Sequence, residues 1–380
     1  MNSSTLHHHV GRLSKKLLLA YTFDWLIIIL FAAAGGALSF VSPVHQVFSL
    51  LNLEISHPYI EETITTWMLV VIALLCPAVL ILAITIFLVP GSQVRKRLSR
   101  GQIWRLKAWE LEKGLAGLCL SVAVAFFITQ GMKNMFGKPR PSLLARCQPD
   151  LDVLAEHVVG GWGQDLSMRW TLVDSGICGT TDRKSLDDGF RSFPSGHASW
   201  SWSGLLYLTL FFCAKFAVGF PFLPPQHSRT AKKERLSWDQ ELLPLHANGA
   251  TGDSQDRGQG QKYEDEMDDP LALRNAAAAP PNYLLIPALL PVGVAVYICS
   301  TRYHQYYHFG FDLLAGSLIG IVTAYVSFRW YHLPISRGQG WAWGSRSRDR
   351  AFWIGVGSAG YVGDEGWESR RGKRGDLEGK

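Results

Sequence analysis

Six long apolar runs constrain this chain more than any other feature of its sequence. They lie at about 17–40, 67–90, 114–130, 198–222, 283–300 and 312–333. A helix that crosses a bilayer needs roughly 20 mostly apolar residues. The run from Trp67 to Pro90 carries no charged residue, whereas a helix in a soluble core normally keeps a polar stripe. The runs therefore predict an all-α polytopic membrane protein, a bundle of six transmembrane helices.

The basic residues predict how this bundle is oriented, because Lys and Arg concentrate on the cytoplasmic side of membrane proteins. Three of them precede the first run or stand at its start, 41–66 contains none, and seven lie between positions 95 and 113. Both ends of the chain, 1–16 and 334–380, are therefore predicted to be cytoplasmic tails. The same alternation accounts for the net charge of +6, so no nucleic-acid partner is expected.

Two connections between the runs are long. The segment at about 223–281 is rich in Gln, Asp, Gly, Ala and Pro, which predicts a disordered cytoplasmic insertion within a membrane domain spanning 17–333. Residues 142–190 are expected on the non-cytosolic side, where a disulfide between Cys147 and Cys178 can form; two free thiols are the alternative. The Gly- and Arg-rich tail after the last run is expected to be flexible.

The first candidate site residues follow the third run, where Lys133 is separated by six residues from Arg140 and Pro141. Both cations can be interfacial anchors. Cations are disfavoured at the outer face, however, and an Arg between two prolines is held in an extended segment. A functional role and an anchoring role are both open for this pair.

The second candidate segment, Ser192-Phe193-Pro194-Ser195-Gly196-His197, comes directly before the fourth run. Ser195 is placed to cap the helix, and Gly196 lets the backbone approach a ligand. The start of a helix offers unpaired N–H groups to an anion, and His197 is placed to give or take a proton. A capped helix with an interfacial histidine is the alternative.

The third segment runs from Thr301 to Asp312 and includes Arg302 and His308. If Asp312 lies in the first turns of the sixth helix, its spacing of four residues puts it on one face with His308, and its carboxylate orients the imidazole. All three segments fall at the same predicted outer boundary. Together they predict a phosphate site at the non-cytosolic face of the membrane.

These three segments resemble the motifs of the type 2 phosphatidic acid phosphatases, the membrane lipid phosphate phosphatases, and the long outer connection resembles fungal members. The family motifs are Lys, six residues, Arg-Pro; Pro-Ser-Gly-His; and Ser-Arg, five residues, His, three residues, Asp. Two positions depart from the family. Thr301 replaces a serine but keeps the hydroxyl, and His304 stands in a variable stretch where related proteins often have Asp.

The resemblance implies a role for each motif residue. His308 is expected to be the nucleophile that forms a phosphohistidine, oriented by Asp312, and His197 the acid and base. The expected phosphate ligands are Lys133, Arg140, Ser195, Gly196 and Arg302, and the three cations among them take the place of a metal ion. No metal or other cofactor is expected.

The activity implied is Mg-independent dephosphorylation of phosphatidate, lysophosphatidate, diacylglycerol pyrophosphate or sphingoid-base phosphates in the bilayer. The alternatives are a polyprenyl diphosphate phosphatase, a sugar-phosphate phosphatase or phosphotransferase of the same fold, and a non-catalytic lipid-binding or transport protein. An endomembrane (vacuole, Golgi or endoplasmic reticulum) or the plasma membrane is the expected location, with the active site facing a lumen or the exterior.

Overall fold

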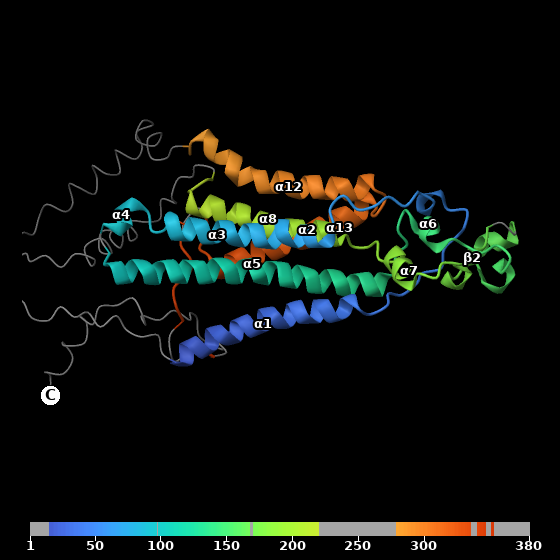
Figure 1. Ribbon diagram of the computed structural model, residues 1–380, viewed down its shortest axis with the longest axis horizontal. Helices are drawn as coiled ribbons and strands as arrows, with labels where there is room; N and C mark the ends of the chain where they lie inside the picture. Colours follow the sequence, from blue (N-terminus) through green and yellow to red (C-terminus); the bar gives the residue numbers. More distant parts are fainter. Residues whose placement is uncertain are drawn as a thin grey trace, which may run out of the picture.

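The computed structural model describes residues 15–96, 98–167, 170–219, 279–335, 340–346 and 351–352. Six long helical segments in this part of the chain form one elongated bundle (Figure 1). They are α1 (Lys15–Ser39), the continuous segment α2–η2–α3 (Thr66–Val70, Val71–Leu75, Cys76–Phe87), α5 (Arg100–Phe136), α8 (Gly196–Lys215), α12 (Leu285–His304) and α13 (Gly310–Tyr331). The chain is thus the mostly helical, polytopic membrane protein that the apolar runs predict.

Short elements join these helices. They are η1 (Leu53–Ile55), α4 (Ser92–Arg95), α6 (Leu143–Cys147), η3 (Leu154–Glu156), β1 (Val158–Gly160), η4 (Trp162–Asp165), β2 (Leu172–Val173), η5 (Ser175–Ile177), α7 (Arg183–Gly189) and η6 (Asn282–Leu284). Strands β1 and β2 pair antiparallel, with Val158 opposite Val173. Most of these elements lie at one end of the bundle, on the right in Figure 1, where α5 ends and α8 and α13 begin. We call it the motif end and the opposite end the tail end.

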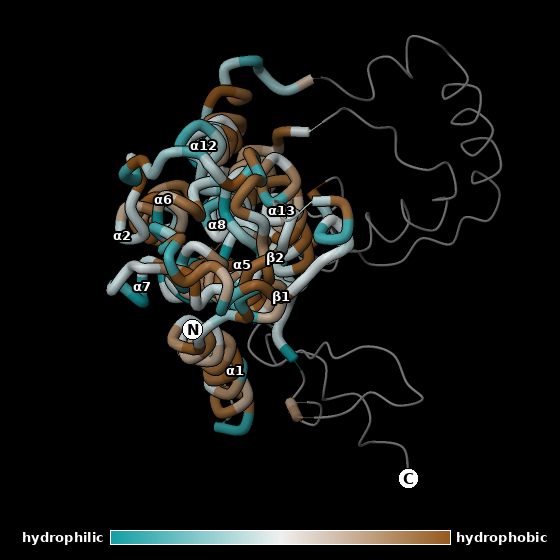
Figure 2. Tube along the Cα trace, turned by 90° about the vertical axis from the view of Figure 1, so that its right-hand side faces the viewer, coloured by the Kyte–Doolittle hydropathy of each residue, from teal (hydrophilic) through white to brown (hydrophobic). Residues whose placement is uncertain are grey.

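Five of the six long segments in the described part of the chain have the length and apolar composition of a membrane span. The exception is α8, whose serines make it more polar. It packs against α5, α12 and α13 and against the α2–η2–α3 segment, so other helices cover most of it. Because a central helix exposes little surface to lipid, it needs fewer apolar residues than its neighbours. By contrast, α1 lies at the edge of the bundle in both views (Figure 2).

Close packing of α8 on α13 depends on two glycines, Gly316 and Gly320, which are four residues apart in α13. A Cβ atom added to Gly316 would lie 2.5 Å from the main-chain oxygen of Ser195, and one added to Gly320 would lie 2.5 Å from that of Ser199. Small residues at this spacing let two helix backbones approach in a membrane. This close packing brings the start of α8 against the start of α13, and so positions two of the three predicted motifs.

Three predicted boundaries differ from the observed ones. The third predicted span, 114–130, is the middle of the 37-residue helix α5, because a capping box at Ser99 starts the helix before the apolar run. The fifth continues to His304, so Thr301 and Arg302 belong to a helix end and not to a connection. The fourth ends at Lys215, short of the predicted 222.

The predicted insertion at 223–281 lies almost entirely outside the described residues. Part of the C-terminal tail is described, and it differs from the flexible tail that the sequence predicts. Residues 340–346 pack on the tail end, where the Ala342 N–H donates to Glu110 at 3.0 Å and the Trp343 N–H to the Tyr331 oxygen at 2.9 Å. The physical reason is that these residues satisfy a buried carboxylate and the open end of α13.

At the motif end, a small second core lies beyond the helix bundle. A disulfide joins Cys147 and Cys178, the pair that the sequence singles out. Around it pack buried apolar side chains from the first connection and the long one: Phe48, Ile55, Leu143, Val173, Ile177, Leu186 and Phe190. His45 ties the two connections together, since its ring nitrogens lie 2.8 Å from Ser175 Oγ and 2.9 Å from Asp187 Oδ1. These contacts hold both connections over the N-terminal ends of α8 and α13.

Candidate active site

The structure brings the three predicted motifs together at the motif end. The main-chain N–H of Ser195, at the start of α8, donates to the main-chain oxygen of Asp312 at 3.0 Å. Lys133, near the end of α5, reaches the same place: a Cβ atom on Gly196 would lie 3.2 Å from its Nζ. Glycine at position 196 therefore lets the ammonium group approach the start of α8.

Ser195 and Gly137 fix the local backbone of two motifs. The buried Ser195 hydroxyl accepts a hydrogen bond from the Ala198 N–H at 3.4 Å and caps α8. Gly137 ends α5 in the left-handed conformation, with φ of 54°, and a Cβ atom there would overlap the Val44 oxygen at 1.8 Å. The turn at Gly137 redirects the chain from Lys133 towards Arg140.

His308 is buried, and its Nδ1 lies 2.6 Å from the main-chain oxygen of Ser192. A carbonyl oxygen can only accept, so Nδ1 carries the proton and donates. Burial first, and then the charges of Arg140 and Lys133, hold the pKa of the imidazole well below its usual value. The ring is therefore neutral near pH 7, and its Nε2 keeps a free lone pair.

The predicted contact between Asp312 and His308 is wrong. Asp312 accepts from Lys138 Nζ at 2.7 Å, from the Ser192 hydroxyl at 2.6 Å and from the Phe309 N–H at 3.1 Å. His308 precedes α13, which begins at Gly310, so the two side chains do not share a helix face. The carboxylate instead reaches the imidazole through Ser192, whose hydroxyl donates to Asp312 and whose carbonyl accepts from His308.

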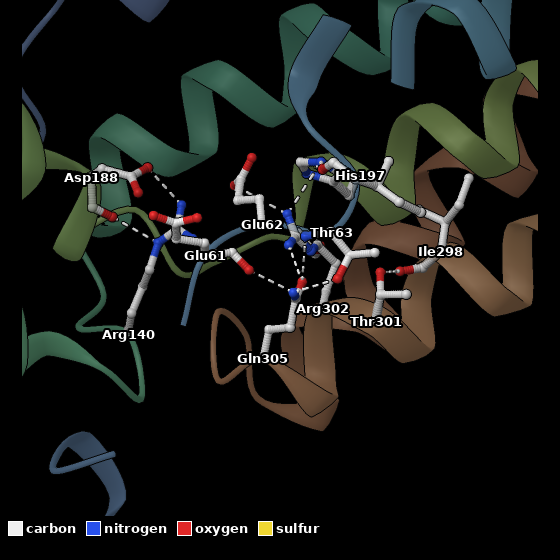
Figure 3. A network of polar contacts seen from close by, with 12 residues as sticks. Glu61, Glu62, Thr63, Arg140, Asp188, His197, Ile298, Thr301, Arg302 and Gln305 are labelled. Atoms are coloured by element: carbon white, nitrogen blue, oxygen red, sulfur yellow. Dashed lines mark hydrogen bonds and ion pairs between the residues drawn. The ribbon is translucent and has the colours of Figure 1, made fainter. Parts of the chain in front are cut away.

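Arg140 and Asp188 form a second part of the site. The Arg140 Nε donates to the Asp188 main-chain oxygen at 2.7 Å and its Nη2 to Oδ1 at 2.6 Å (Figure 3). Arg146 donates to Oδ2 of the same carboxylate at 3.0 Å. Burial alone raises the pKa of the Asp188 carboxyl, but the surrounding cations, Arg140 and Arg146 before the others, together hold the pKa below its usual value. Asp188 is thus a carboxylate that orients both arginines.

Arg302 is fully buried at the end of α12. Its Nη1 lies 3.1 Å from Glu62 Oε1 and 3.2 Å from His197 Nε2, and its Nη2 donates to Gln305 Oε1 at 2.6 Å (Figure 3). His197 Nε2 also lies 2.9 Å from the main-chain oxygen of Ile64. A guanidinium can only donate and a carbonyl can only accept. Unprotonated Nε2 can therefore accept from Arg302, and protonated Nε2 can donate to the Ile64 carbonyl.

Guanidinium groups from three segments of the chain contact the Tyr307 ring. Their central carbons lie 4.4 Å (Arg302), 5.0 Å (Arg140) and 5.2 Å (Arg146) from the ring centroid. Such cation–π contacts offset part of the cost of burying cations close together. Tyr307 directly precedes His308 in the chain. The arginines that contact the Tyr307 ring are therefore held close to the segment that carries the imidazole.

Sequence reasoning assigned no role to several residues of this site, some of which lie within its candidate segments: Glu62, Lys138, Arg146, Asp188, Ser192, Gln305 and Tyr307. Lys138 and Gln305 lie inside the motif spacings, and Ser192 lies two residues before Pro194. Their positions within or beside the motifs are the one signal that points to them. Glu62 and Asp188 lie in connections with no such signal. Thr301 donates to the main-chain oxygen of Ile298 at 2.7 Å, and His304 is exposed.

The chain is similar in sequence to proteins that are named as phosphatases of lipid phosphates. The chain is 26% identical over 212 residues to Lipid phosphate phosphatase 1 of Arabidopsis thaliana, covering 56% of this chain and 54% of that protein. It is 32% identical over 202 residues to Diacylglycerol pyrophosphate phosphatase 1 of Saccharomyces cerevisiae, covering 53% of this chain and 61% of that one. A probable diacylglycerol pyrophosphate phosphatase of Schizosaccharomyces pombe is 26% identical over 295 residues, 77% of this chain and 74% of the relative.

None of the solved structures matches the chain. The model of one protein family does, over residues 114–335, a region that holds all three motifs and more than half of the chain. The chain therefore belongs to the PAP2 superfamily.

Proposed function

We propose that this protein is a membrane-bound phosphatase that removes phosphate from lipid phosphates through a phosphohistidine at His308. The observation that carries the proposal is the hydrogen bond from His308 Nδ1 to the Ser192 carbonyl. It fixes the tautomer whose Nε2 lone pair is free, which is the form that a nucleophilic imidazole needs.

The first step forms a bond between His308 Nε2 and phosphorus and breaks the bond between phosphorus and the lipid oxygen. The lipid oxygen leaves with a proton from His197. In the second step His197 takes a proton from water, the water oxygen attacks phosphorus, and the bond to Nε2 breaks. The paired surroundings of His197 Nε2, a donor at 3.2 Å and an acceptor at 2.9 Å, suit a group that must hold and release a proton.

The cations of the site are suited to bind the phosphoryl oxygens. Lys133 lies beside Gly196 at the start of α8, where N–H groups and the helix dipole also favour an anion. Arg140 and Arg302 flank Tyr307. Charges held in a buried site stabilise a phosphoryl transition state without reorganising, so we expect the reaction to proceed without a metal ion.

The substrate proposed is a lipid because the site lies at one end of a membrane-spanning bundle. The candidates are phosphatidate, lysophosphatidate, diacylglycerol pyrophosphate and sphingoid-base phosphates, and the names of the relatives from both yeasts favour diacylglycerol pyrophosphate. A panel of these lipids, with a polyprenyl diphosphate and a sugar phosphate as the competing classes, separates them when phosphate release is measured with and without chelator.

The decisive test is phosphate release by purified His308→Ala and His197→Ala proteins in detergent micelles. Both are expected to lose turnover while inserting into the membrane like the wild type. The exposed His304→Ala change is the matched control and is expected to keep activity. Normal turnover by His308→Ala protein would refute the mechanism, and failure to trap a labelled phosphoenzyme without acid quenching would favour a binding or transport protein.

We also propose that the motif end faces a lumen or the exterior, with both ends of the chain in the cytosol, in an endomembrane or the plasma membrane. The disulfide supports this orientation because disulfides persist in oxidising compartments. Trp162 is 94% exposed at the motif end, so a Trp162→Cys label tests it. A membrane-impermeant maleimide should reach this cysteine only from the non-cytosolic side of intact cells or vesicles.

A further inference from the structure

Gln305 is a buried amide whose side chain uses both of its polar atoms. It lies in the turn after α12 and is 4% exposed. Its Oε1 accepts from Arg302 Nη2 at 2.6 Å. Its Nε2 donates to the main-chain oxygen of Glu61 and to the hydroxyl of Thr63, both at 2.7 Å (Figure 3). One side chain therefore joins the end of α12 to residues 61–64 of the first connection.

Residues 61–64 also hold His197. The main-chain oxygen of Ile64 lies 2.9 Å from His197 Nε2, one residue beyond the threonine that Gln305 binds. This carbonyl accepts a hydrogen bond only from the protonated nitrogen. The position of the segment thus bears directly on the form of His197 that donates a proton.

Arg302 completes a closed set of contacts. It lies 3.2 Å from His197 Nε2 and 3.1 Å from Glu62 Oε1, and it is held by Gln305. The positions of the Arg302 guanidinium and the His197 imidazole therefore both depend on residues 61–64, and the buried Gln305 side chain holds these residues in place. Glu62 contributes a carboxylate from the same segment.

We propose that Gln305 is a positioning residue that fixes His197 relative to Arg302 by holding residues 61–64 in place. The inference rests on the proposed function and adds to it a residue that touches neither the phosphate nor the leaving group. Because it acts through the Ile64 carbonyl, its loss is expected to impair protonation of the leaving group more than binding of the phosphate.

The choice of leaving group separates this role from a merely structural one. A lipid alkoxide needs a proton in order to leave, whereas p-nitrophenolate leaves without one. A misplaced His197 slows the first reaction selectively. A general loss of folded protein, or a weaker phosphate clamp, slows both reactions by the same factor.

The experiment compares dioctanoyl phosphatidate with p-nitrophenyl phosphate for the wild type and Gln305→Glu protein in micelles. This change keeps an oxygen for Arg302 but removes both donors to the 61–64 segment. We expect kcat/KM for the lipid to fall about tenfold more than kcat/KM for the aryl ester, a modest share of what acid catalysis usually contributes. His304→Glu places the same carboxylate on the exposed neighbour and is expected to leave the ratio unchanged.

A second variant, Thr63→Val, keeps the shape of the segment and removes one acceptor. It is expected to change the ratio in the same direction by a smaller factor, and it decides the question if Gln305→Glu protein does not fold. Equal losses for both substrates, or no loss, would overturn the positioning role while leaving the phosphatase intact. Wild-type protein that hydrolyses neither substrate would overturn the proposed function itself, and this inference with it.

Discussion

Both ends of the bundle bury charged side chains, but they pair them differently. At the tail end, Glu110 of α5 accepts from Lys215 of α8 and from the Ala342 N–H, and Arg346 binds Asp24 at 2.8 Å. At the motif end, the Lys133 ammonium group makes no hydrogen bond or ion pair with another side chain or main-chain group of the described residues. The Nε atoms of Arg302 and Arg146 also lack partners among those residues.

Under the proposed function, this difference separates charges that stabilise the fold from charges that bind the substrate. A buried charge is costly unless it is paired. The paired charges of the tail end are therefore the arrangement expected of residues that stabilise the fold. Cations with unused donors at the motif end are suited to bind an anion that completes their hydrogen bonds. Substitutions at the motif end should therefore affect turnover, and substitutions at the tail end should affect stability.

The largest effect is expected from Arg302→Met at the motif end. Losing a guanidinium from a phosphoryl-transfer site reduces turnover by about 10³–10⁵-fold in other enzymes, and the partly exposed Glu62 can be hydrated once unpaired. Phosphate release and the thermal unfolding midpoint are measured together. Turnover within tenfold of the wild type would contradict the distinction between the two ends.

At the tail end, Lys215→Met should lower stability without impairing the chemistry. It leaves the Glu110 carboxylate buried without its ammonium partner, which costs about 3–5 kcal/mol in comparable buried pairs. The unfolding midpoint should fall clearly, while kcat at a permissive temperature stays near the wild-type value. Adding Glu110→Gln should recover part of the loss, and a drop in kcat with unchanged stability would argue against this assignment.

Replacing both Cys147 and Cys178 by serine should have a smaller effect on stability. The disulfide closes a sequence separation of 31 residues, and loss of a disulfide typically costs about 2–4 kcal/mol. Because Arg146 adjoins Cys147 and contacts Asp188, we also expect a rise in KM. Replacing Cys119, which lies in α5, is the control, and an unchanged midpoint in the double variant would count against a structural role.

The smallest expected effect is on the pH dependence of stability. His308 stays neutral in the folded state because its pKa is lowered, whereas in the unfolded chain it binds a proton below its ordinary value of 6.5. Stability should therefore fall as the pH drops below 6.5, and His308→Asn should flatten the slope by up to about 1.4 kcal/mol per pH unit. Unfolding followed at several acidic pH values tests this, and identical slopes would show that His308 is protonated in the fold.

Much of the site could be predicted from sequence because its chemistry lies in short motifs beside apolar runs. His308, His197 and the cations Lys133, Arg140 and Arg302 all meet at one end of the bundle. Asp312 shows the limit of such reasoning. A spacing of four residues predicts a contact only within a helix, and His308 lies two residues before Gly310, where α13 begins.

The sequence alone determined the number of long helices and the motif residues for which we propose roles, since both follow from local composition and spacing. The tertiary structure decided how those groups are held. Ser192 became the link between Asp312 and His308, and Gln305 became the link between α12 and the first connection. These contacts join residues more than 100 positions apart. They depend on how the helices pack and how the connections fold over them, which no local pattern encodes.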